Sequence, residues 1–251
     1  MKKLKKPLLF TLCLIPPALV GGWFSAVILL NSTDAQMLEP AIRQVGSKEA
    51  LMMLTTLQIV LYAVICGFLG YLLADKLGLI RPFRLAKKES CITLLAGAIA
   101  GIILSADAFT FAKWIPALEG NYDTAKEFDA ATWIASVLYG GIIEETLLRL
   151  FFMSLLAFIG WKLFCRKEEQ VPTKVLVISN IIAGIAFAAA HLPSTAMLME
   201  LTPMLVFRCF LLNGSFGIVF GRLYRKYGIQ YAMLAHMLTH IVSRTIWLII
   251  L

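Results

Sequence analysis

The chain has 251 residues, of which 60% are hydrophobic and 15% are charged, and its formal net charge is +8. Only about half of the residues of a soluble domain are apolar, so this composition excludes an ordinary soluble globular protein. The basic residues form short clusters between apolar runs, as cytoplasmic loops of membrane proteins do, which argues against nucleic-acid binding.

Apolar runs of about 20 residues recur along the chain, and each could cross a hydrocarbon core about 30 Å thick. Backbone polar groups must be satisfied within lipid, and the runs are too long for barrel strands. We therefore predict an all-α, polytopic bundle of about seven transmembrane helices, within a range of six to eight. The predicted spans cover residues 7–30, 50–74, 91–112, 131–164, 175–191, 204–221 and 229–251.

The distribution of charge between the runs predicts the orientation of the bundle. The first apolar run follows the basic start MKKLKK and is longer than the apolar core of a signal peptide, so we expect an uncleaved anchor. The polar loops 31–49 and 113–129 are weighted toward acidic residues, whereas 81–88 and 222–226 are basic. We expect a multi-pass cell-membrane protein, prokaryotic, with a cytoplasmic N-terminus and an external C-terminus.

Several local features refine this topology. The run 131–164 exceeds one straight span, so it is either a long tilted helix or a broken one, and a break would reverse the sidedness of everything after it. Pro193 is predicted to end the fifth span. The spacings GAIAG at 97–101 and GIVFG at 217–221 favour close approach of a neighbouring helix. The five cysteines are scattered and are predicted to be free apolar residues.

Charged residues interrupt the apolar stretch GGIIEETLLRLFF at 140–152. A charge at mid-membrane costs roughly 2.5–3.5 kcal/mol, so such residues usually mark function. On an α-helix Glu145 and Arg149 share a face and can pair, whereas Glu144 points about 100° away and stays free to act as a general base. The alternative is that all three form an ion-pair network that only fixes helix packing.

All three histidines of the chain also lie in predicted spans. His191 follows Phe187 by one turn in FAAAH, and His236 and His240 are one turn apart in HMLTH. Two histidines at this spacing can hold one metal ion or bracket one reacting group. A single intramembrane histidine more often makes a structural hydrogen bond, but three of them together with paired glutamates predict a site. Arg208 and Asn213 could line it, although packing or snorkelling explains them equally well.

These segments carry a resemblance. EETLLR, FAAAH and HMLTH resemble the EExxxR, FxxxH and HxxxN/D motifs of the CAAX protease and bacteriocin-processing (CPBP, Abi-like) family of intramembrane endopeptidases, which includes the type II CAAX prenyl endopeptidases. The resemblance covers about residues 131–243. It implies a catalytic helical core in residues 131–251, preceded by N-terminal transmembrane helices in residues 1–130.

The resemblance also implies roles for individual residues. Glu144 would be the general base that activates water, supported by Glu145 and Arg149, while His191 and His236 would orient the water or bind metal. His240 stands where the family has the asparagine or aspartate proposed to stabilise the oxyanion. This departure leaves the oxyanion role open and favours a metal alternative: a divalent ion such as zinc, with ligands drawn from His191, His236, His240 and Glu144.

The implied function is hydrolysis of a peptide bond in a membrane-embedded or lipid-anchored protein or peptide, such as a bacteriocin precursor. One alternative is a non-catalytic membrane scaffold or immunity factor with the same fold. Another is a small transporter that uses glutamate and histidine as a proton relay, although the sequence shows no internal repeat. The intact motifs favour the enzyme, because a scaffold has no physical need for a free carboxylate.

One geometric requirement follows from the predicted topology. The fifth and seventh helices run parallel, yet His191 lies late in the first of them and His236 early in the second. They can share a site only if the two helices are offset by about 12 Å, at ~1.5 Å per residue.

Overall fold

The computed structural model describes residues 4–84, 86–118, 122, 125 and 127–251. This part of the chain is helical and contains no strand, and seven helical runs are long and apolar enough to cross a membrane. The prediction of an all-α bundle with seven spans is therefore confirmed. The runs are Lys5–Ser32, Lys48–Lys76, Lys87–Lys113, Ala130–Phe164, Thr173–Leu198, Pro203–Tyr227 and Ile229–Ile250.

The first three spans are formed by α1 (Lys5–Ser32), α3 (Lys48–Lys76) and α4 (Lys87–Ser105). The region 31–49, predicted as a loop, contains the short helix α2 (Ala35–Val45). Asp34 caps this helix by accepting a hydrogen bond from the backbone N–H of Gln36 at 2.7 Å. An exposed pair between Arg43 and Glu39 supports it one turn further on.

After α4 the chain makes three short 3₁₀ turns, η2 (Ala106–Phe109), η3 (Phe111–Lys113) and η4 (Pro116–Leu118). Glu119, Asp123 and Lys126, which contribute to the predicted charge of the loop 113–129, lie outside the described residues. The next helix begins at Asp129, whose carboxylate accepts from the backbone N–H groups of Ala131 and Thr132.

The fourth span is continuous over Ala130–Phe164, so the long helix, and not the broken one, is the correct alternative. Its parts are α6 (Ala130–Ala135), η6 (Ser136–Glu144), η7 (Thr146–Met153) and α7 (Ser154–Phe164). The two middle segments are π-helical, with hydrogen bonds between residues i and i+5 that widen each turn. Residues five apart therefore lie on one face here, as residues four apart do in an α-helix, and contacts between residues four apart remain within reach.

The last three spans are α8 (Thr173–Leu198), then α9 (Pro203–Cys209), η8 (Phe210–Gly214) and α10 (Ser215–Tyr227) in one run, and finally α11 (Ile229–Ile250). The prediction that Pro193 ends the fifth span is wrong, because α8 continues to Leu198. The hydroxyls of Ser194 and Thr195 donate to the carbonyl oxygen of His191 at 2.9 and 2.8 Å, within the turn that carries the proline. Membrane helices tolerate proline where such groups satisfy the backbone.

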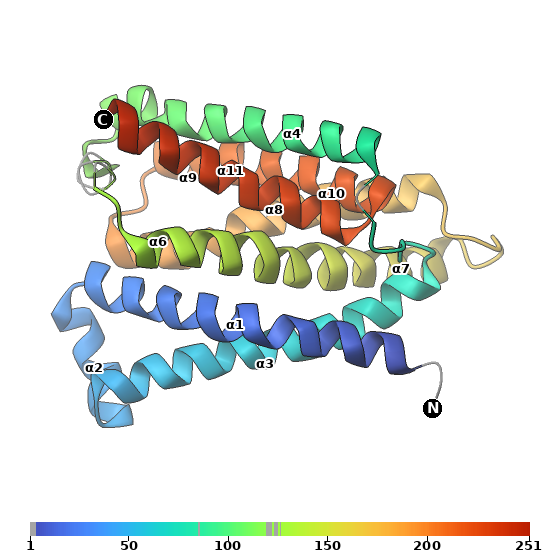
Figure 1. Ribbon diagram of the computed structural model, residues 1–251, viewed down its shortest axis with the longest axis horizontal. Helices are drawn as coiled ribbons and strands as arrows, with labels where there is room; N and C mark the ends of the chain where they lie inside the picture. The colour runs from blue at the N-terminus through green and yellow to red at the C-terminus, as the bar shows by residue number, and fades with distance from the viewer. Residues whose placement is uncertain (1–3, 85, 119–121, 123–124, 126) are drawn as a thin grey trace.

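Figure 1 shows the arrangement of the spans: α1 and α3 lie side by side along one side of the fourth span, and α4 and α11 pair along the other. The small-residue spacing at 97–101 explains the pairing of α4 with α11. An ideal Cβ on Gly97 would lie 2.6 Å from the carbonyl oxygen of Ala235, and one on Gly101 would lie 2.8 Å from that of Thr239. The predicted close approach is thus made with the helix that carries His236 and His240.

The basic loops gather at the end of the bundle that holds the N-terminus, and α2, the loop before α6 and the C-terminus lie at the other end (Figure 1). Residues 81–84 and the basic segment 222–226, which is the last part of α10 and not a loop, lie at the same end, as predicted, since Arg81, Arg84 and Lys226 line one small cavity. The segment 82–84 is held to the start of α11, since the hydroxyl of Tyr231 donates to the carbonyl oxygen of Arg84 at 3.0 Å and the amide of Gln230 donates to that of Pro82 at 3.2 Å.

The required offset between α8 and α11 is also present. At the basic end, the hairpin between α7 and α8 extends farther than the turn between α10 and α11 (Figure 1). The late residues of α8 therefore lie level with the early residues of α11. The ring of Phe187 meets that of His236 edge-on, with 5.9 Å between their centroids.

Candidate active site

The carboxylate of Glu145 joins the fourth span to α11. Its Oε2 atom lies 3.3 Å from Nε of Arg149, the contact that the four-residue spacing predicts. Its Oε1 atom accepts a hydrogen bond from Nδ1 of His236 at 2.9 Å. The side chains of Glu145 and Arg149 are 0% and 1% exposed. A charge buried this deeply is tolerated only when it is paired, so Glu145 depends on these two partners: a hydrogen bond from His236 and an ion-pair contact with Arg149 that forms no hydrogen bond.

Arg149 also packs against two aromatic rings. Its guanidinium lies over the ring of Phe187, 4.3 Å from the centroid, and 6.0 Å from the centroid of Phe220. Cation–π contacts of this kind are strongest where water is excluded. Gly217 leaves the space for the guanidinium, since an ideal Cβ there would lie 2.9 Å from Nη2 of Arg149. The phenylalanine of FAAAH thus helps to hold the cation that neutralises Glu145.

Glu144 faces a different environment from its neighbour. It lines a cavity of about 190 Å³, which all three histidines also line. Among the described residues, no side chain or backbone group makes a hydrogen bond or an ion pair with the carboxylate of Glu144. One carboxylate of the pair therefore has a hydrogen bond at Oε1 and an ion-pair contact at Oε2, while the other lines a small cavity and is available for chemistry.

The hydrogen bonds of the histidines determine which ring nitrogens carry protons. Nδ1 of His191 lies 2.7 Å from the carbonyl oxygen of Phe187, and an oxygen of this kind can only accept, so Nδ1 of His191 donates. By the same reasoning Nδ1 of His236 donates to Glu145. In the neutral rings Nε2 of both residues then holds a lone pair. Nε2 of His236 accepts from Nε2 of His240 at 3.1 Å, which makes His240 the donor.

The cavity contains two polar residues that the sequence did not single out, Tyr139 and Ser136, which line it from η6. Asn213, which the sequence suggested as a lining residue, lines it from η8. On an α-helix Tyr139 and Glu144 would point about 140° apart at ~100° per residue, so the α-helical pattern gave no signal for the tyrosine. The π-helical geometry brings residues five apart to one face.

Arg208, which the sequence grouped with Asn213, has a different position. Its Nε atom lies 2.8 Å from both carboxylate oxygens of Asp107, and its guanidinium also contacts the hydroxyl of Tyr122. Burial, more than any charge, raises the pKa of that tyrosine, so its hydroxyl remains a donor to Asp107. This cluster ties the segment after α4 to α9 and lies outside the cavity of Glu144.

The residues present provide only part of a metal site. Nε2 of His236 and of His240 are 3.1 Å apart, and Glu145 orients His236 through Nδ1 as second-shell carboxylates do at zinc sites. A protein-held zinc ion takes at least three protein ligands. Within the described ranges no group of three or more histidine, cysteine, aspartate or glutamate side chains is placed to hold one ion. The donor set therefore does not fit a complete protein-ligated metal centre.

Comparison with known proteins identifies the part of the chain that carries this site. The family model described as "Type II CAAX prenyl endopeptidase Rce1-like" matches residues 126–242. This range contains both glutamates, Arg149 and the three histidines. No curated protein and no solved structure shows a significant match to the chain.

Proposed function

We propose that this multi-pass membrane protein is an intramembrane endopeptidase in which Glu144 activates the attacking water, and the match of the type II CAAX prenyl endopeptidase Rce1-like family model to residues 126–242 supports the proteolytic function. One observation carries the assignment of the base. Glu144 faces the cavity without a protein partner among the described residues, whereas Glu145 is bound by Arg149 and His236. A general base must be free to accept a proton, and only Glu144 meets this condition.

The proposed reaction uses the residues around the cavity in a definite order. Water held between Glu144 and the lone pair on Nε2 of His191 loses a proton to Glu144 as its oxygen attacks the carbonyl carbon of the substrate. The carbonyl oxygen becomes an oxyanion. The proton on Glu144 then passes to the amide nitrogen as the carbon–nitrogen bond breaks. A cavity that excludes bulk water strengthens each of these electrostatic interactions.

The remaining residues support the base and the oxyanion. Arg149 neutralises Glu145, and Glu145 fixes the tautomer of His236, so we assign these residues to positioning. His240 donates from Nε2 and stands where the family places its oxyanion donor, which makes it the first candidate for that role. The amide of Asn213 is a second donor lining the same cavity, and its present bond to the thiol of Cys209, at 3.4 Å, is weak.

No step of this mechanism requires a metal ion. A metal-assisted reaction is the alternative, although His236 and His240 supply only part of the ligands that zinc needs, and metal analysis of the purified protein distinguishes the two. In both cases the substrate is a protein or peptide that is membrane-embedded or lipid-anchored, because the catalytic residues lie in membrane-spanning helices. We place the N-terminus in the cytoplasm of a prokaryotic cell, with residues 1–130 as supporting helices for the core 131–251.

The proposal can be tested with purified protein in detergent. A library of apolar peptides is incubated with the protein in water enriched in ¹⁸O, and the products are identified by mass spectrometry. Hydrolysis by activated water places one ¹⁸O atom in the new carboxylate. Peptides that bind but are never cleaved would favour the non-catalytic scaffold.

A further inference from the structure

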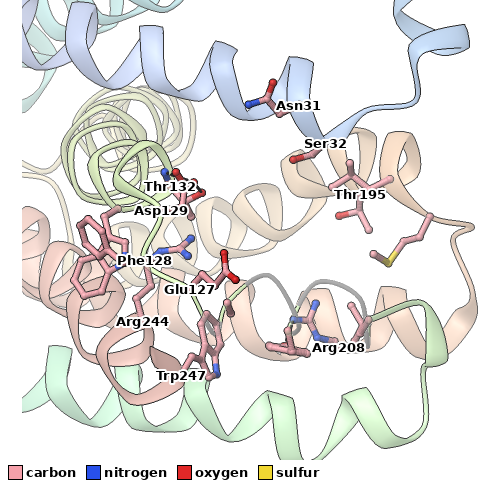
Figure 2. A pocket seen from close by; sticks show the side chains of 16 residues that line it. Asn31, Ser32, Glu127, Phe128, Asp129, Thr132, Thr195, Arg208, Arg244 and Trp247 are labelled. Atoms are coloured by element: carbon pink, nitrogen blue, oxygen red, sulfur yellow. Dashed lines mark hydrogen bonds between the residues drawn. The ribbon is translucent and has the colours of Figure 1, made fainter. Parts of the chain in front are cut away.

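A second and larger cavity, here called the vestibule, lies at the end of the bundle opposite the basic loops. Its volume is about 790 Å³, within the range of roughly 300–1,000 Å³ typical of ligand sites. Figure 2 shows its walls, with Asn31 and Ser32 at the end of α1, Thr195 on α8, and Arg244 and Trp247 on α11. No motif of the sequence and no step of the proposed mechanism uses this cavity.

The vestibule lies next to the catalytic cavity along α8 and along α11. Thr195 lines the vestibule one turn beyond His191 on α8, and Arg244 lines it one turn beyond His240 on α11. A direct bond joins the two linings: Nε of Arg244 donates to the hydroxyl of Ser136 at 3.0 Å, and Ser136 faces the catalytic cavity. The vestibule is therefore the space directly above the catalytic residues.

The opposite side of the catalytic residues is filled by packed side chains. Below Glu145 and Arg149, the buried residues Leu150 and Met153 belong to one hydrophobic core with Phe220 and Tyr224. The hydroxyls of Ser154 and Tyr224 are bonded to each other at 2.7 Å within this layer. A small cavity near Arg84 and Tyr231 lies at the basic end. Within the described residues, the packed layer separates the catalytic residues from this end.

The charges at the two ends of the bundle indicate on which side of the membrane the vestibule opens. Lysine and arginine dominate the loops and helix ends at the basic end, which carry Arg81, Arg84, Lys87, Arg166, Lys167 and Lys226. The described loops around the vestibule carry more acidic residues, among them Asp34, Glu127, Asp129 and Glu200. Loops rich in lysine and arginine remain in the cytoplasm, so the vestibule opens on the other side.

We propose that the vestibule is the substrate-binding entrance of the site and that it admits peptide segments from the non-cytoplasmic side of the membrane. This inference rests on the proposed proteolytic function and narrows its substrates. They are exported peptides, or the external segments next to a membrane span, and not cytoplasmic tails. The lining suits an extended peptide, because Asn31, Thr132 and Thr195 offer hydrogen bonds to a backbone and Trp133 and Trp247 offer aromatic surfaces.

Thiol labelling tests the accessibility of the two ends without relying on activity. In a background with the five native cysteines replaced, Ser32→Cys places a thiol in the vestibule and Ser136→Cys places one in the catalytic cavity. Arg84→Cys, an exposed position at the basic end, is the matched control. We expect a small membrane-impermeant thiol reagent added to intact cells to modify the first two, and to modify Arg84→Cys only after the membrane is permeabilised.

Blocking the entrance tests its use by the substrate. A bulky maleimide attached to Ser32→Cys should abolish cleavage of a peptide by the detergent-solubilised protein, whereas the same group on Arg84→Cys should leave cleavage unchanged. If the reagent modified Arg84→Cys from outside and left Ser32→Cys unmodified, the vestibule would not open on the non-cytoplasmic side. If blocked Ser32→Cys kept full activity, the vestibule would not be the entrance for the substrate. Absence of cleavage by the unmodified protein would contradict the proposed function alone, since the labelling result would still decide which end is open to the outside.

Discussion

Gly140 and His240 occupy one shared space in the catalytic cavity. An ideal Cβ on Gly140 would lie 2.9 Å from Nε2 of His240 and 3.8 Å from Nε2 of His236. The first of the two glycines before the glutamates therefore has a specific role: it leaves room for the imidazole that donates to His236. The obstructed atom is the tip of a side chain and not backbone, so a methyl group at position 140 would displace the ring without forcing the helices apart.

We predict that Gly140→Ala lowers peptide cleavage while the protein still folds, because His240 loses its contact with His236. The double variant Gly140→Ala/His240→Asn should recover activity, since asparagine is too short to reach the contested space. Cleavage rates and thermal unfolding in detergent measure both effects. Gly214→Ala is the control, because an ideal Cβ there meets no atom closer than 3.8 Å. Wild-type cleavage by Gly140→Ala would show that the position of His240 does not matter.

Glu144→Gln should abolish proteolysis without affecting folding or membrane insertion. Glutamine keeps the shape of glutamate but cannot accept a proton at neutral pH, and the loss of a general base costs about 10²–10⁴-fold in rate. The ¹⁸O assay measures the rate, and Glu168→Gln, in the exposed loop between α7 and α8, serves as the control. If Glu144→Gln cleaved at the normal rate, the assignment of the base would be wrong.

Arg149→Leu should destabilise the protein as well as inactivate it. The change leaves the Glu145 carboxylate buried with only His236 as a partner, and breaking a buried ion pair in this way costs about 3–5 kcal/mol. Arg43→Leu breaks a pair with the same four-residue spacing whose side chains are 77% and 56% exposed, and such pairs are worth about 0–1 kcal/mol. Equal thermal stability of the two variants would show that the buried pair makes no net contribution.

His240→Asn distinguishes the two roles left for this residue. The substitution supplies the residue that the family places there, so an oxyanion donor should be preserved and cleavage should continue. If His240 instead holds an essential metal ion, both bound metal and activity should fall. Metal analysis by mass spectrometry and the cleavage assay on the same preparation give the two readings. We expect activity to survive and the metal content to match that of the wild-type protein.

The α-helical spacing rule predicted one contact correctly and missed another. It brought Glu145 to Arg149 and left Glu144 apart, because the four-residue contact survives in the wider turns of a π-helix. The rule could not predict that Tyr139 lines the same cavity as Glu144, because no residue pattern predicts a π-helix. A separate expectation, that a proline ends a helix, failed at Pro193, where local hydroxyl bonds and neighbouring helices sustain the helix.

The sequence by itself determined that the protein is a helical membrane bundle, which segments cross, and which polar residues are costly enough to be functional. Those properties follow from the hydrophobicity and charge of each segment, which are local. Only the tertiary structure decided that His236 binds Glu145, that Arg149 rests on Phe187, and that a vestibule opens above Glu144 at one end. Each of these depends on the axial offset and close approach of helices distant in the chain, which packing sets and no single segment encodes.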